Sequence, residues 1–512
     1  MRNLTADYYP LLGTRAQRYL YRTVSSPNGF YCHDGVYWVS GTGFYANGVF
    51  KGTVTDTRKR FCSLGSKIII LPDNAYYDIS TDTFGQLGAS AVSIRVQIRD
   101  GEYMGEWAAA NTIYAYLGSF TDIFRAGDAV FISGASSIDA SAAYIIREVD
   151  GRELRFYENS FSLAEDDARN AAMDSDDSDT DTRVYHVAET ATVTIERRIP
   201  DMDYICENEN RLWGCKGDSI YASKLGDPTN WYCFDGLSTD SYSVDLGLGS
   251  AGDFTACCAY LGYPTFFKEE HIYKIYGDRP TNFQAMASAT LGVEAGSDRS
   301  LAVAGEVLYY QSRIGIVAYS GGIPTTISRA FGTERHRNAV GGSDGRKYYC
   351  SMADAAGNYR LYVYDSQTRL WHIEDDLQVM DFGWLDELYF MDAGGSVWVG
   401  GNIREVPSGA TEEAAFDSFV ETGDFTLSSP DKKGTSKFQL RVELDAGATL
   451  TVRALFDSGA ERDWITVGEL TAQVKRSYYL PIVPRRADHL RLRLEGRGFP
   501  HAEKPYNRLP DK

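Results

Sequence analysis

The fold is decided by the stretch Arg211-Leu-Trp-Gly-Cys-Lys-Gly-Asp-Ser-Ile-Tyr-Ala-Ser-Lys-Leu-Gly-Asp-Pro-Thr-Asn-Trp231. It places an aromatic strand at Leu212-Trp213, a turn at Lys216-Gly-Asp218 and a second strand at Ile220-Tyr221. Tight hairpin turns need a positive φ, which glycine supplies without steric cost. The stretch therefore predicts a β-hairpin followed by a Gly-Asp-Pro turn and a tryptophan.

Similar strand pairs recur along the chain at a regular spacing. Corresponding apolar positions at Leu212, Phe266, Tyr309, Tyr348 and Tyr389 are separated by steps of 54, 43, 39 and 41 residues. A period of roughly 40–50 residues is typical of β-propeller blades, each a four-stranded sheet that cannot bury both faces alone. We therefore expect an all-β fold with a β-propeller of six or seven blades. The 49 Gly, 35 Tyr and 24 Phe residues suit such a chain.

One gap in the repeat indicates an inserted domain. The step from Ile68 to Leu212 is 144 residues, about 100 more than a blade needs. Three short strands within residues 124–161 make this insertion a small β-barrel in our interpretation. Strands after residue 416 suggest a C-terminal β-sandwich or jelly roll. The predicted parts are an N-terminal arm (1–19), a first propeller part (20–85), the inserted small β-barrel domain with an acidic loop (86–192), a second propeller part (193–405), a linker (406–415), the C-terminal β-sandwich (416–498) and a C-terminal arm (499–512).

Helical signals are weak throughout the sequence. The two best tracts for a short helix are residues 165–173 and residues 411–416. The rest of the chain is expected to be strands and turns.

Charge and cysteine usage narrow the classes of function. The formal net charge is −19, which disfavours adhesion to nucleic acid or to anionic membranes. No signal-peptide or membrane-spanning run is present, so we expect a soluble protein made in the cytoplasm. Eight scattered cysteines form no Cys-x-x-Cys pair, which favours buried free thiols.

The stretch from 211 to 231 resembles a blade motif of phage tail hub and packaged-DNA stabilisation proteins. A Leu-Trp strand, a Gly turn, an Ile-Tyr strand ending in Ser and a Gly-Asp-Pro-x-x-Trp turn carry this resemblance. A weaker copy runs from Phe266 to Phe283, and the termini contribute Ala6-Asp-Tyr-Tyr-Pro10 and residues 475–486. The likeness is loose over about three-quarters of the chain and sharp over about 20 residues. The large insertion and the separate C-terminal module depart from the best-known hub proteins.

The resemblance implies a structural virion protein in the tail of a short-tailed phage, made in the host bacterial cytoplasm. Subunits would form a ring, a hexamer by tail symmetry, that serves as hub or nozzle and closes the DNA channel until ejection. Its expected partners are copies of itself, head–tail adaptor or portal-side proteins, and tail fibre or plug proteins. DNA would pass only as a duplex in the lumen, and no membrane anchoring is expected. An acidic wall lets the duplex slide because it repels phosphate.

Motifs of catalysis are missing from the sequence, so we expect no enzyme activity and no cofactor. There is no Gly-x-Ser-x-Gly, His-Glu-x-x-His or Walker-type loop. Seven histidines lie far apart in the sequence, although a propeller could gather some of them at its axis.

The alternative is a propeller-based tail protein that binds or hydrolyses host-surface polysaccharide. Candidate acid and aromatic pairs are Asp227 with Trp231 and Asp381 with Trp384. Their structural interpretation is an Asp that caps its own turn and a Trp that fills the space between blades. Aromatic residues exposed on one rim favour the glycan alternative, and buried ones favour the structural interpretation.

Two charged clusters are candidate interaction sites. The acidic loop contains Asp174, Asp176, Asp177, Asp179 and Asp181. It fails the EF-hand pattern, because Asp179 and Tyr185 stand where Gly and Glu are required, so it is either a solvated loop or a lining of the tail lumen. A basic cluster in the C-terminal domain could meet carboxylates of an adjacent subunit or be ordinary solvated strand residues; its members are Arg485, Arg486, Arg491, Arg493 and Arg497.

Overall fold

The computed structural model describes the chain apart from residues 6, 8–11, 103–110, 158–159, 162–183, 248–250, 402, 427–430, 458, 473–476 and 499–512. The described residues form strands joined by turns, with four 3₁₀ helices of three or four residues: η1 (Pro280–Asn282), η2 (Asp298–Ser300), η3 (Ser328–Phe331) and η4 (Glu461–Asp463). The prediction of an all-β chain is confirmed. The chain divides into two compact units, Met1–Phe50 with Val293–Lys512, and Lys51–Gly292.

The unit Lys51–Gly292 contains three four-stranded antiparallel sheets. The first is β8 (Arg60–Leu64), β9 (Lys67–Leu71), β10 (Ala75–Asp78) and β11 (Thr83–Gln86); the second is β18 (Tyr204–Asn208), β19 (Arg211–Lys216), β20 (Ser219–Ala222) and β21 (Tyr242–Asp245); the third is β22 (Ala256–Tyr260), β23 (Tyr263–Lys268), β24 (His271–Tyr276) and β25 (Gln284–Ala289). The predicted hairpin is β19–β20, closed at Gly217 with φ 55°. Trp213 lies buried in a core shared by the second and third sheets.

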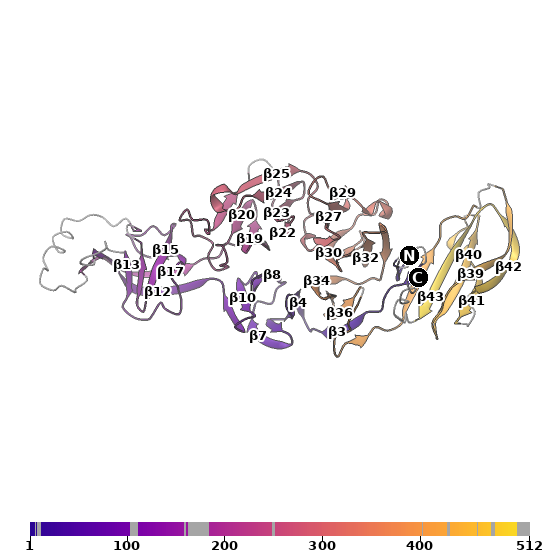
Figure 1. Ribbon diagram of the computed structural model, residues 1–512, viewed down its shortest axis with the longest axis horizontal. Helices are drawn as coiled ribbons and strands as arrows, with labels where there is room; N and C mark the ends of the chain where they lie inside the picture. The colour runs from indigo at the N-terminus through magenta and orange to yellow at the C-terminus, as the bar shows by residue number, and fades with distance from the viewer. Residues whose placement is uncertain are drawn as a thin grey trace, which may run out of the picture. The chain divides into compact units, whose positions relative to one another are not determined.

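The same unit contains a closed barrel with the strand order β12-β13-β16-β15-β14-β17. Its strands are β12 (Ala89–Glu102), β13 (Thr112–Ala115), β14 (Ala129–Ser133), β15 (Ala143–Asp150), β16 (Glu153–Phe156) and β17 (Val184–Arg197), and Figure 1 labels several of them. The long strands β12 and β17 pair antiparallel from Ala89↔Arg197 to Glu102↔Val184. Apolar residues such as Ile98, Phe120 and Phe156 fill the interior.

Before the C-terminal module, the other unit contributes to three further four-stranded antiparallel sheets and one five-stranded antiparallel sheet. Their strands are β4 (Pro27–Cys32), β5 (Val36–Ser40), β6 (Gly43–Ala46) and β7 (Val49–Thr53); β26 (Ala302–Ala304), β27 (Val307–Ser312), β28 (Gly315–Tyr319) and β29 (Thr325–Thr326); β30 (Arg337–Ser343), β31 (Lys347–Ala353), β32 (Tyr359–Asp365) and β33 (Leu370–Ile373); and β34 (Val379–Leu385), β35 (Glu387–Asp392), β36 (Ser396–Gly400) and β3 (Tyr19–Thr23), with β37 (Thr411–Glu412) at the edge. The last of these sheets joins distant parts of the sequence, because β3 pairs with β36 (Figure 1).

The first 19 residues make specific contacts with later parts of their unit. The short strands β1 (Leu4–Thr5) and β2 (Gly13–Thr14) pair with each other. Arg2 bridges to Ile373 and Phe419, and the Arg15 guanidinium donates to both carboxylate oxygens of Glu413 at 2.7 and 2.8 Å. The described part of the predicted N-terminal arm is therefore docked on the chain.

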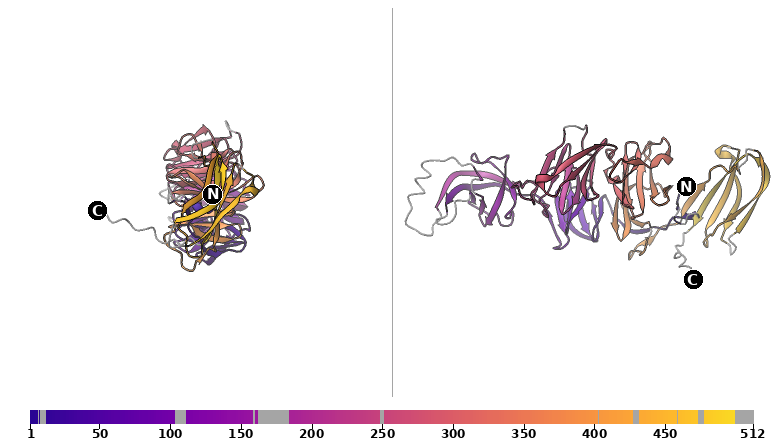
Figure 2. Two further views of the ribbon diagram at one scale, coloured as in Figure 1. Left: turned by 90° about the vertical axis from the view of Figure 1, so that its right-hand side faces the viewer. Right: turned by 45° about the horizontal axis from the view of Figure 1, so that its top comes forward.

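The C-terminal module contains two antiparallel sheets around one apolar core. One has the strand order β38-β43-β40-β41 and the other is the pair β39-β42. The bounds are β38 (Phe416–Glu421), β39 (Lys433–Arg441), β40 (Thr449–Phe456), β41 (Ile465–Thr471), β42 (Ser477–Ala487) and β43 (Leu490–Gly498), coloured yellow to orange in Figure 2. Val452 of the first sheet and Tyr478 and Leu480 of the second share the core.

The expected helix at 411–416 is wrong. Thr411–Glu412 is strand β37, which pairs with β3 at Tyr19↔Glu412, and Phe416 begins strand β38. Pairing with a strand distant in sequence overrides the weak local helix preference. The other tract, 165–173, lies outside the described residues. No helix in the described part of the chain is long and apolar enough to cross a bilayer.

Candidate functional site

The predicted acidic loop, Asp174 to Asp181, lies outside the described residues. The predicted basic cluster lies on β42 and β43 of the C-terminal module. Arg485 and Arg486 are both exposed near the end of β42, opposite Thr435 and Gly434 of β39. The Arg485 guanidinium carbon lies 6.0 Å from the centre of the Phe456 ring. These two side chains are available for an external partner.

Arg491 and Arg493 are engaged within their own module. Arg491 Nε donates to Asp424 at 2.5 Å, and Arg493 Nη2 donates to Glu421 at 3.0 Å. Arg493 also bonds Glu461 and lies 4.2 Å from the Trp464 ring centre. The hydrogen bonds to Glu461 raise the pKa of Arg493 above its usual value. Arg491 and Arg493 were predicted to share one face of a strand and to be candidates for contact with an adjacent subunit. In the structure they form ion pairs that connect β43 to neighbouring segments of its own module.

The pair Asp227 and Trp231 occupies a structural turn. Asp227 accepts hydrogen bonds from Thr229 at 2.7 Å, Asn230 at 2.7 Å and Arg125 at 2.6 Å. Burial opposes ionisation, but these donors outweigh it and lower the pKa of Asp227. The Trp231 side chain is 1% exposed and donates to the Pro228 carbonyl at 2.8 Å. Both side chains are committed to internal contacts.

The side chains of Asp381 and Trp384 do not point toward each other. Asp381 is buried, accepts the Phe30 backbone N–H at 3.0 Å and pairs with Arg299. Trp384 is 49% exposed on the same strand, β34. Residues three apart in a strand point to opposite faces, which explains the separation. Trp384 therefore does not lie beside this carboxylate.

The eight cysteines and His336 lie mostly in the interior of the described chain. All eight cysteines are free thiols, six of them buried and two partly buried, as expected. His336 is buried, and its Nε2 lies 3.0 Å from the Tyr362 hydroxyl. Burial lowers the pKa of His336.

A carboxylate and histidine group in the C-terminal module was not foreseen from the sequence. Asp457, Asp488 and His489 each place one donor atom within 4.8 Å of the others. The Asp488 backbone N–H donates to Asp457 Oδ1 at 2.9 Å, and Asp488 pairs with His489. The group sits where the turn after β40 meets the turn between β42 and β43, and its members bond one another.

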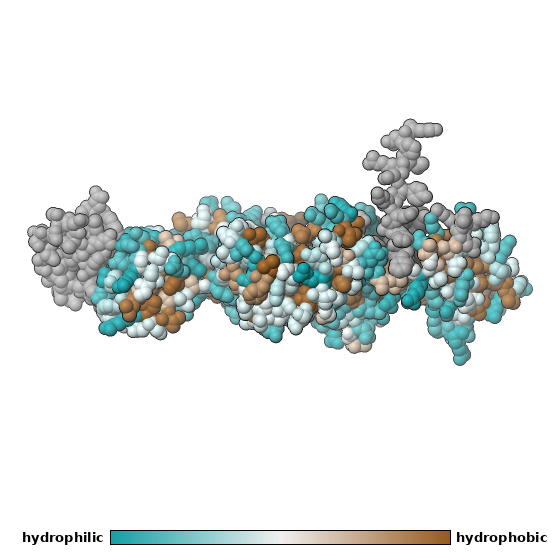
Figure 3. All heavy atoms as spheres, turned by 90° about the horizontal axis from the view of Figure 1, so that it is seen from below, coloured by the Kyte–Doolittle hydropathy of each residue, from teal (hydrophilic) through white to brown (hydrophobic). Residues whose placement is uncertain are grey.

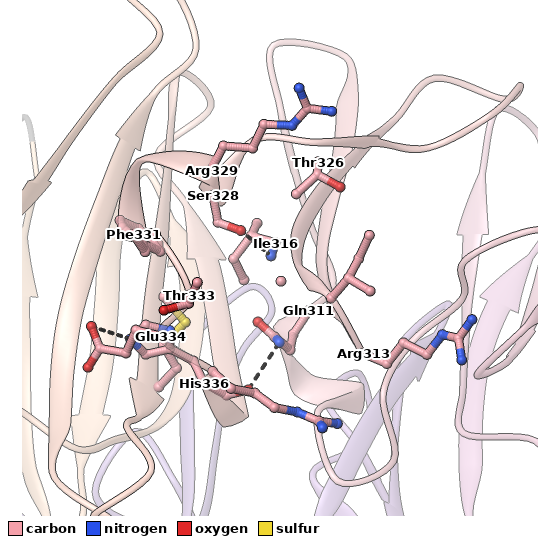
Figure 4. A pocket seen from close by; sticks show the side chains of 15 residues that line it. Gln311, Arg313, Ile316, Thr326, Ser328, Arg329, Phe331, Thr333, Glu334 and His336 are labelled. Carbon is pink, nitrogen blue, oxygen red and sulfur yellow. Dashed lines mark hydrogen bonds and ion pairs between the residues drawn. The ribbon is translucent and has the colours of Figure 1, made fainter.

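A cavity of about 280 Å³ lies in the described chain, and the sequence did not indicate it. It lies between β27, β28, η3 and the segment that leads into β30. Gln311 at the end of β27 is 1% exposed, and its Nε2 donates to the carbonyls of Ser312 at 2.8 Å and His336 at 3.2 Å. In Figure 4 its amide lies between Ser328 and His336.

The cavity lies where η3 packs closely against β28. The Ile316 backbone N–H donates to Ser328 Oγ at 3.0 Å, which holds η3 against β28. Gly315 has φ 127°, and a Cβ there would stand 2.2 Å from Ser328 Oγ, so only glycine permits the approach. Contacts of this kind depend on tertiary packing, which no local sequence pattern encodes.

Comparison with known proteins assigns no family. No family model matches the chain, and no curated protein matches it. Among solved structures, Raptor of Chaetomium thermophilum is similar at 10% identity and a TM-score of 0.32, over 77% of this chain and 29% of that one. This chain thus spans less than a third of the Raptor chain.

Two bacterial structures are similar over more of their length. PorZ, a surface component of the type-IX secretion system of Porphyromonas gingivalis, has 12% identity and a TM-score of 0.27, over 89% of this chain and 71% of that one. The extracellular domain of a one component system of B. thetaiotaomicron has 9% identity and a TM-score of 0.22, over 90% and 91% of the two chains. All three TM-scores are low, and these likenesses assign no function to this chain.

Proposed function

We propose that this chain is a structural virion protein that forms a ring, the hub or nozzle, in the tail of a short-tailed phage. The ring continues or closes the DNA channel and takes part in DNA retention and ejection. It is sixfold, contacts adaptor or portal-side proteins on one side and fibre or plug proteins on the other, and carries no catalytic site or cofactor. The resemblance of residues 211–231 to the tail-hub blade motif is the starting point.

The proposal includes a seven-bladed β-propeller with an inserted barrel and a C-terminal sandwich. Outside the C-terminal module, the described residues form six four-stranded antiparallel sheets and the five-stranded sheet β34-β35-β36-β3-β37, which together would supply seven blades. The repeat markers Leu212, Phe266, Tyr309, Tyr348 and Tyr389 all lie on the second strand of their sheets. Completion of one sheet by both β36 and the early strand β3 is the way a propeller joins its first and last blades.

Burial of the aromatic residues in the blade motif, residues 211–231, supports the structural interpretation. Trp213 and Trp231 are buried, and Asp227 accepts hydrogen bonds from its own turn and from Arg125. Buried aromatic residues are what the structural interpretation expects of this motif. The glycan alternative needs exposed aromatic residues gathered on one rim.

The apolar side chains on the surface are compatible with subunit contacts of small area. On the face shown in Figure 3, apolar side chains lie in small groups separated by polar ones. Exposed Arg485 and Arg486 offer a cationic contact in a chain of net charge −19. Opposite charges across an interface set its register and specificity. We therefore place the subunit interface at these two arginines.

The second candidate function is a tail protein that binds or hydrolyses host-surface polysaccharide. One observation favours its binding form, the cavity beside Gln311 with arginines at its rim.

The molar mass of the purified chain, measured by light scattering alone and with the phage adaptor proteins, tests the ring. We expect a ring mass in at least one of these conditions. A stable monomer that ignores the adaptor and binds or cleaves host glycan would overturn the proposal in favour of the second candidate.

Charge reversal tests the interface separately. The double variant Arg485→Glu/Arg486→Glu should lower the mass to that of a monomer. Its matched control, Arg337→Glu/Arg462→Glu, changes the charge equally at exposed positions and should leave the ring intact. An intact ring in both variants removes these arginines from the interface and leaves the ring proposal standing.

A further inference from the structure

Three cysteines that are scattered in the sequence gather between the second and third sheets of the unit Lys51–Gly292. Cys206 lies on β18, Cys215 on β19 and Cys257 on β22. Cys206 and Cys215 are buried in the core that these two sheets share, and Cys257 packs against that core. Packing of the two sheets therefore brings together thiols that the sequence keeps apart.

The Cys257 thiol contacts both of the others. It lies within hydrogen-bonding reach of the Cys206 thiol and of the Cys215 thiol. Residues of β18 and β22 also have Cα atoms within 8 Å of each other. Disulfides usually join cysteines whose Cα atoms are about 4.4–6.8 Å apart. A bond between Cys206 and Cys257 is therefore compatible with the packing of these two strands.

Cys257 is the thiol of this group that an oxidant reaches first. Its side chain is partly buried, whereas Cys206 is 9% exposed and Cys215 is 0% exposed. Burial raises the pKa of Cys257 well above its usual value, and the hydrogen bond from Cys206 opposes this rise. Because the thiolate is the reactive form, oxidation of Cys257 should be slow but should begin at this residue.

We propose that Cys206 and Cys257 form a disulfide when the folded chain meets hydrogen peroxide. The Cys257 sulfur takes one oxygen from the peroxide and becomes a sulfenic acid, and one water molecule leaves. The Cys206 sulfur then attacks the Cys257 sulfur, the S–O bond breaks, and the hydroxyl group leaves with the Cys206 proton as a second water. Two thiols are thus oxidised, and one hydrogen peroxide is reduced to two water molecules.

The bond joins two sheets of the unit covalently. Its cysteines are 51 residues apart in the sequence, so it closes a long loop and restricts the unfolded chain. Thiols stay reduced in the cytoplasm, and disulfides persist in oxidising surroundings. The bond therefore forms after the chain leaves the cell, a timing that rests on the proposed synthesis in a bacterial cytoplasm. Formation of the bond in the purified chain does not depend on the tail ring.

Thiol counting before and after oxidation tests the proposal. The purified full chain is incubated with excess hydrogen peroxide, denatured and labelled with N-ethylmaleimide, and its mass is then measured. We expect eight labels on the reduced chain and two fewer on the oxidised chain, with dithiothreitol restoring all eight. Eight labels after oxidation, or a loss that dithiothreitol does not reverse, would overturn the proposal.

Peptide mapping identifies the bonded residues. A protease digest of the oxidised chain should yield the peptide of Cys206 linked to the peptide of Cys257. Tandem mass spectrometry of this product distinguishes Cys257 from its neighbour Cys258 and needs no variant that could fail to fold. A link from Cys257 to Cys215, or a link that uses Cys258, would overturn the assigned pair.

Two variants provide an independent check. Cys257→Ala should lose no label on oxidation that dithiothreitol restores, because Cys206 then has no bonding partner. Cys258→Ala is the matched control: Cys258 is the next residue of β22, is also partly buried, and points to the opposite face of the strand. It should form the bond as the unaltered chain does. A bond in Cys257→Ala, or none in Cys258→Ala, would contradict the assignment. A ring that assembles from a chain unable to form the bond refutes this inference alone only if the unaltered chain also lacks the bond, and a bonded chain that stays monomeric refutes only the ring.

Discussion

Arg18 and Glu374 form an ion pair inside the chain, with Arg18 Nη2 2.5 Å from Glu374 Oε2. Arg18 is 2% exposed, and its other terminal nitrogen lies 2.5 Å from Asp375. The residue immediately precedes strand β3, which pairs with β36. This ion pair therefore holds the early strand to a part of the chain more than 350 residues away.

Removing Arg18 should be strongly destabilising. Arg18→Met leaves Glu374 buried without its cation, a loss of about 3–5 kcal/mol in the free energy of unfolding. Chemical denaturation followed by fluorescence measures it. The control is Arg2→Gln, which breaks the exposed pair with Asp376 and should cost less than about 1 kcal/mol. Equal losses in the two variants would contradict this prediction.

Acid should weaken the same contact. Burial opposes ionisation of Glu374, but Arg18 and its neighbours outweigh burial and hold the pKa of this carboxyl well below its usual range. A carboxyl with a lowered folded pKa stabilises the fold fully above its unfolded pKa of about 4.3 and loses that contribution as the pH falls toward the folded pKa. The stability deficit of Glu374→Gln relative to the unaltered chain should therefore be largest at neutral pH and shrink below about pH 4. Thermal melts across this range measure it, and a constant deficit would count against the assignment.

The barrel should depend on Asp128. This carboxylate is 0% exposed, accepts Arg197 Nη1 at 2.6 Å and accepts the Arg125 backbone N–H at 3.0 Å. Asp128→Ala removes the carboxylate partner of the Arg197 guanidinium and leaves it only the Leu87 carbonyl, at a cost of about 3–5 kcal/mol. Limited proteolysis should then cleave within residues 89–197 much faster. Asp122→Ala, a change at an exposed aspartate, should leave the cleavage rate unaltered.

The cysteines should react slowly in the folded chain. Burial raises the pKa of Cys233 to about 11 and that of Cys350 to about 12. With a pKa near 11, only about 0.1% of a thiol is thiolate at pH 8, and the thiolate is the nucleophile. Ellman's reagent at pH 8 should label these thiols slowly before denaturation and titrate all eight cysteines after it. A denatured count below eight would reveal disulfides instead.

The repeat was readable from sequence because each sheet repeats one local pattern. Tyr309 and Tyr348 were chosen as equivalent apolar positions, and both lie on the second strand of a four-stranded sheet. The long barrel strands β12 and β17 were missed because their pairing joins residues about 100 apart, and β17 crosses the expected boundary at 192. Pairing over such distances leaves no local pattern.

The cavity could not be foreseen for a similar reason. Gln311 is an ordinary polar residue at the end of a strand in sequence, and its hydrogen bonds to the Ser312 and His336 carbonyls become evident only in the folded chain. Arg485, Arg486, Arg491 and Arg493 were predicted as members of one basic cluster, but the partners of Arg491 and Arg493, Asp424 and Glu461, come from segments distant in sequence.

The pairing of β3 with β36 also sets an order of events during translation. Residues 19–23 leave the ribosome first, but their partner, Ser396–Gly400, is made about 375 residues later. At synthesis rates near 5–20 residues per second, this delay is roughly 20–75 s. Throughout that time the nascent chain carries an unpaired edge strand, which is open to association with other chains. The long separation of β3 and β36 in the sequence therefore lengthens the period in which the nascent chain can associate with other chains.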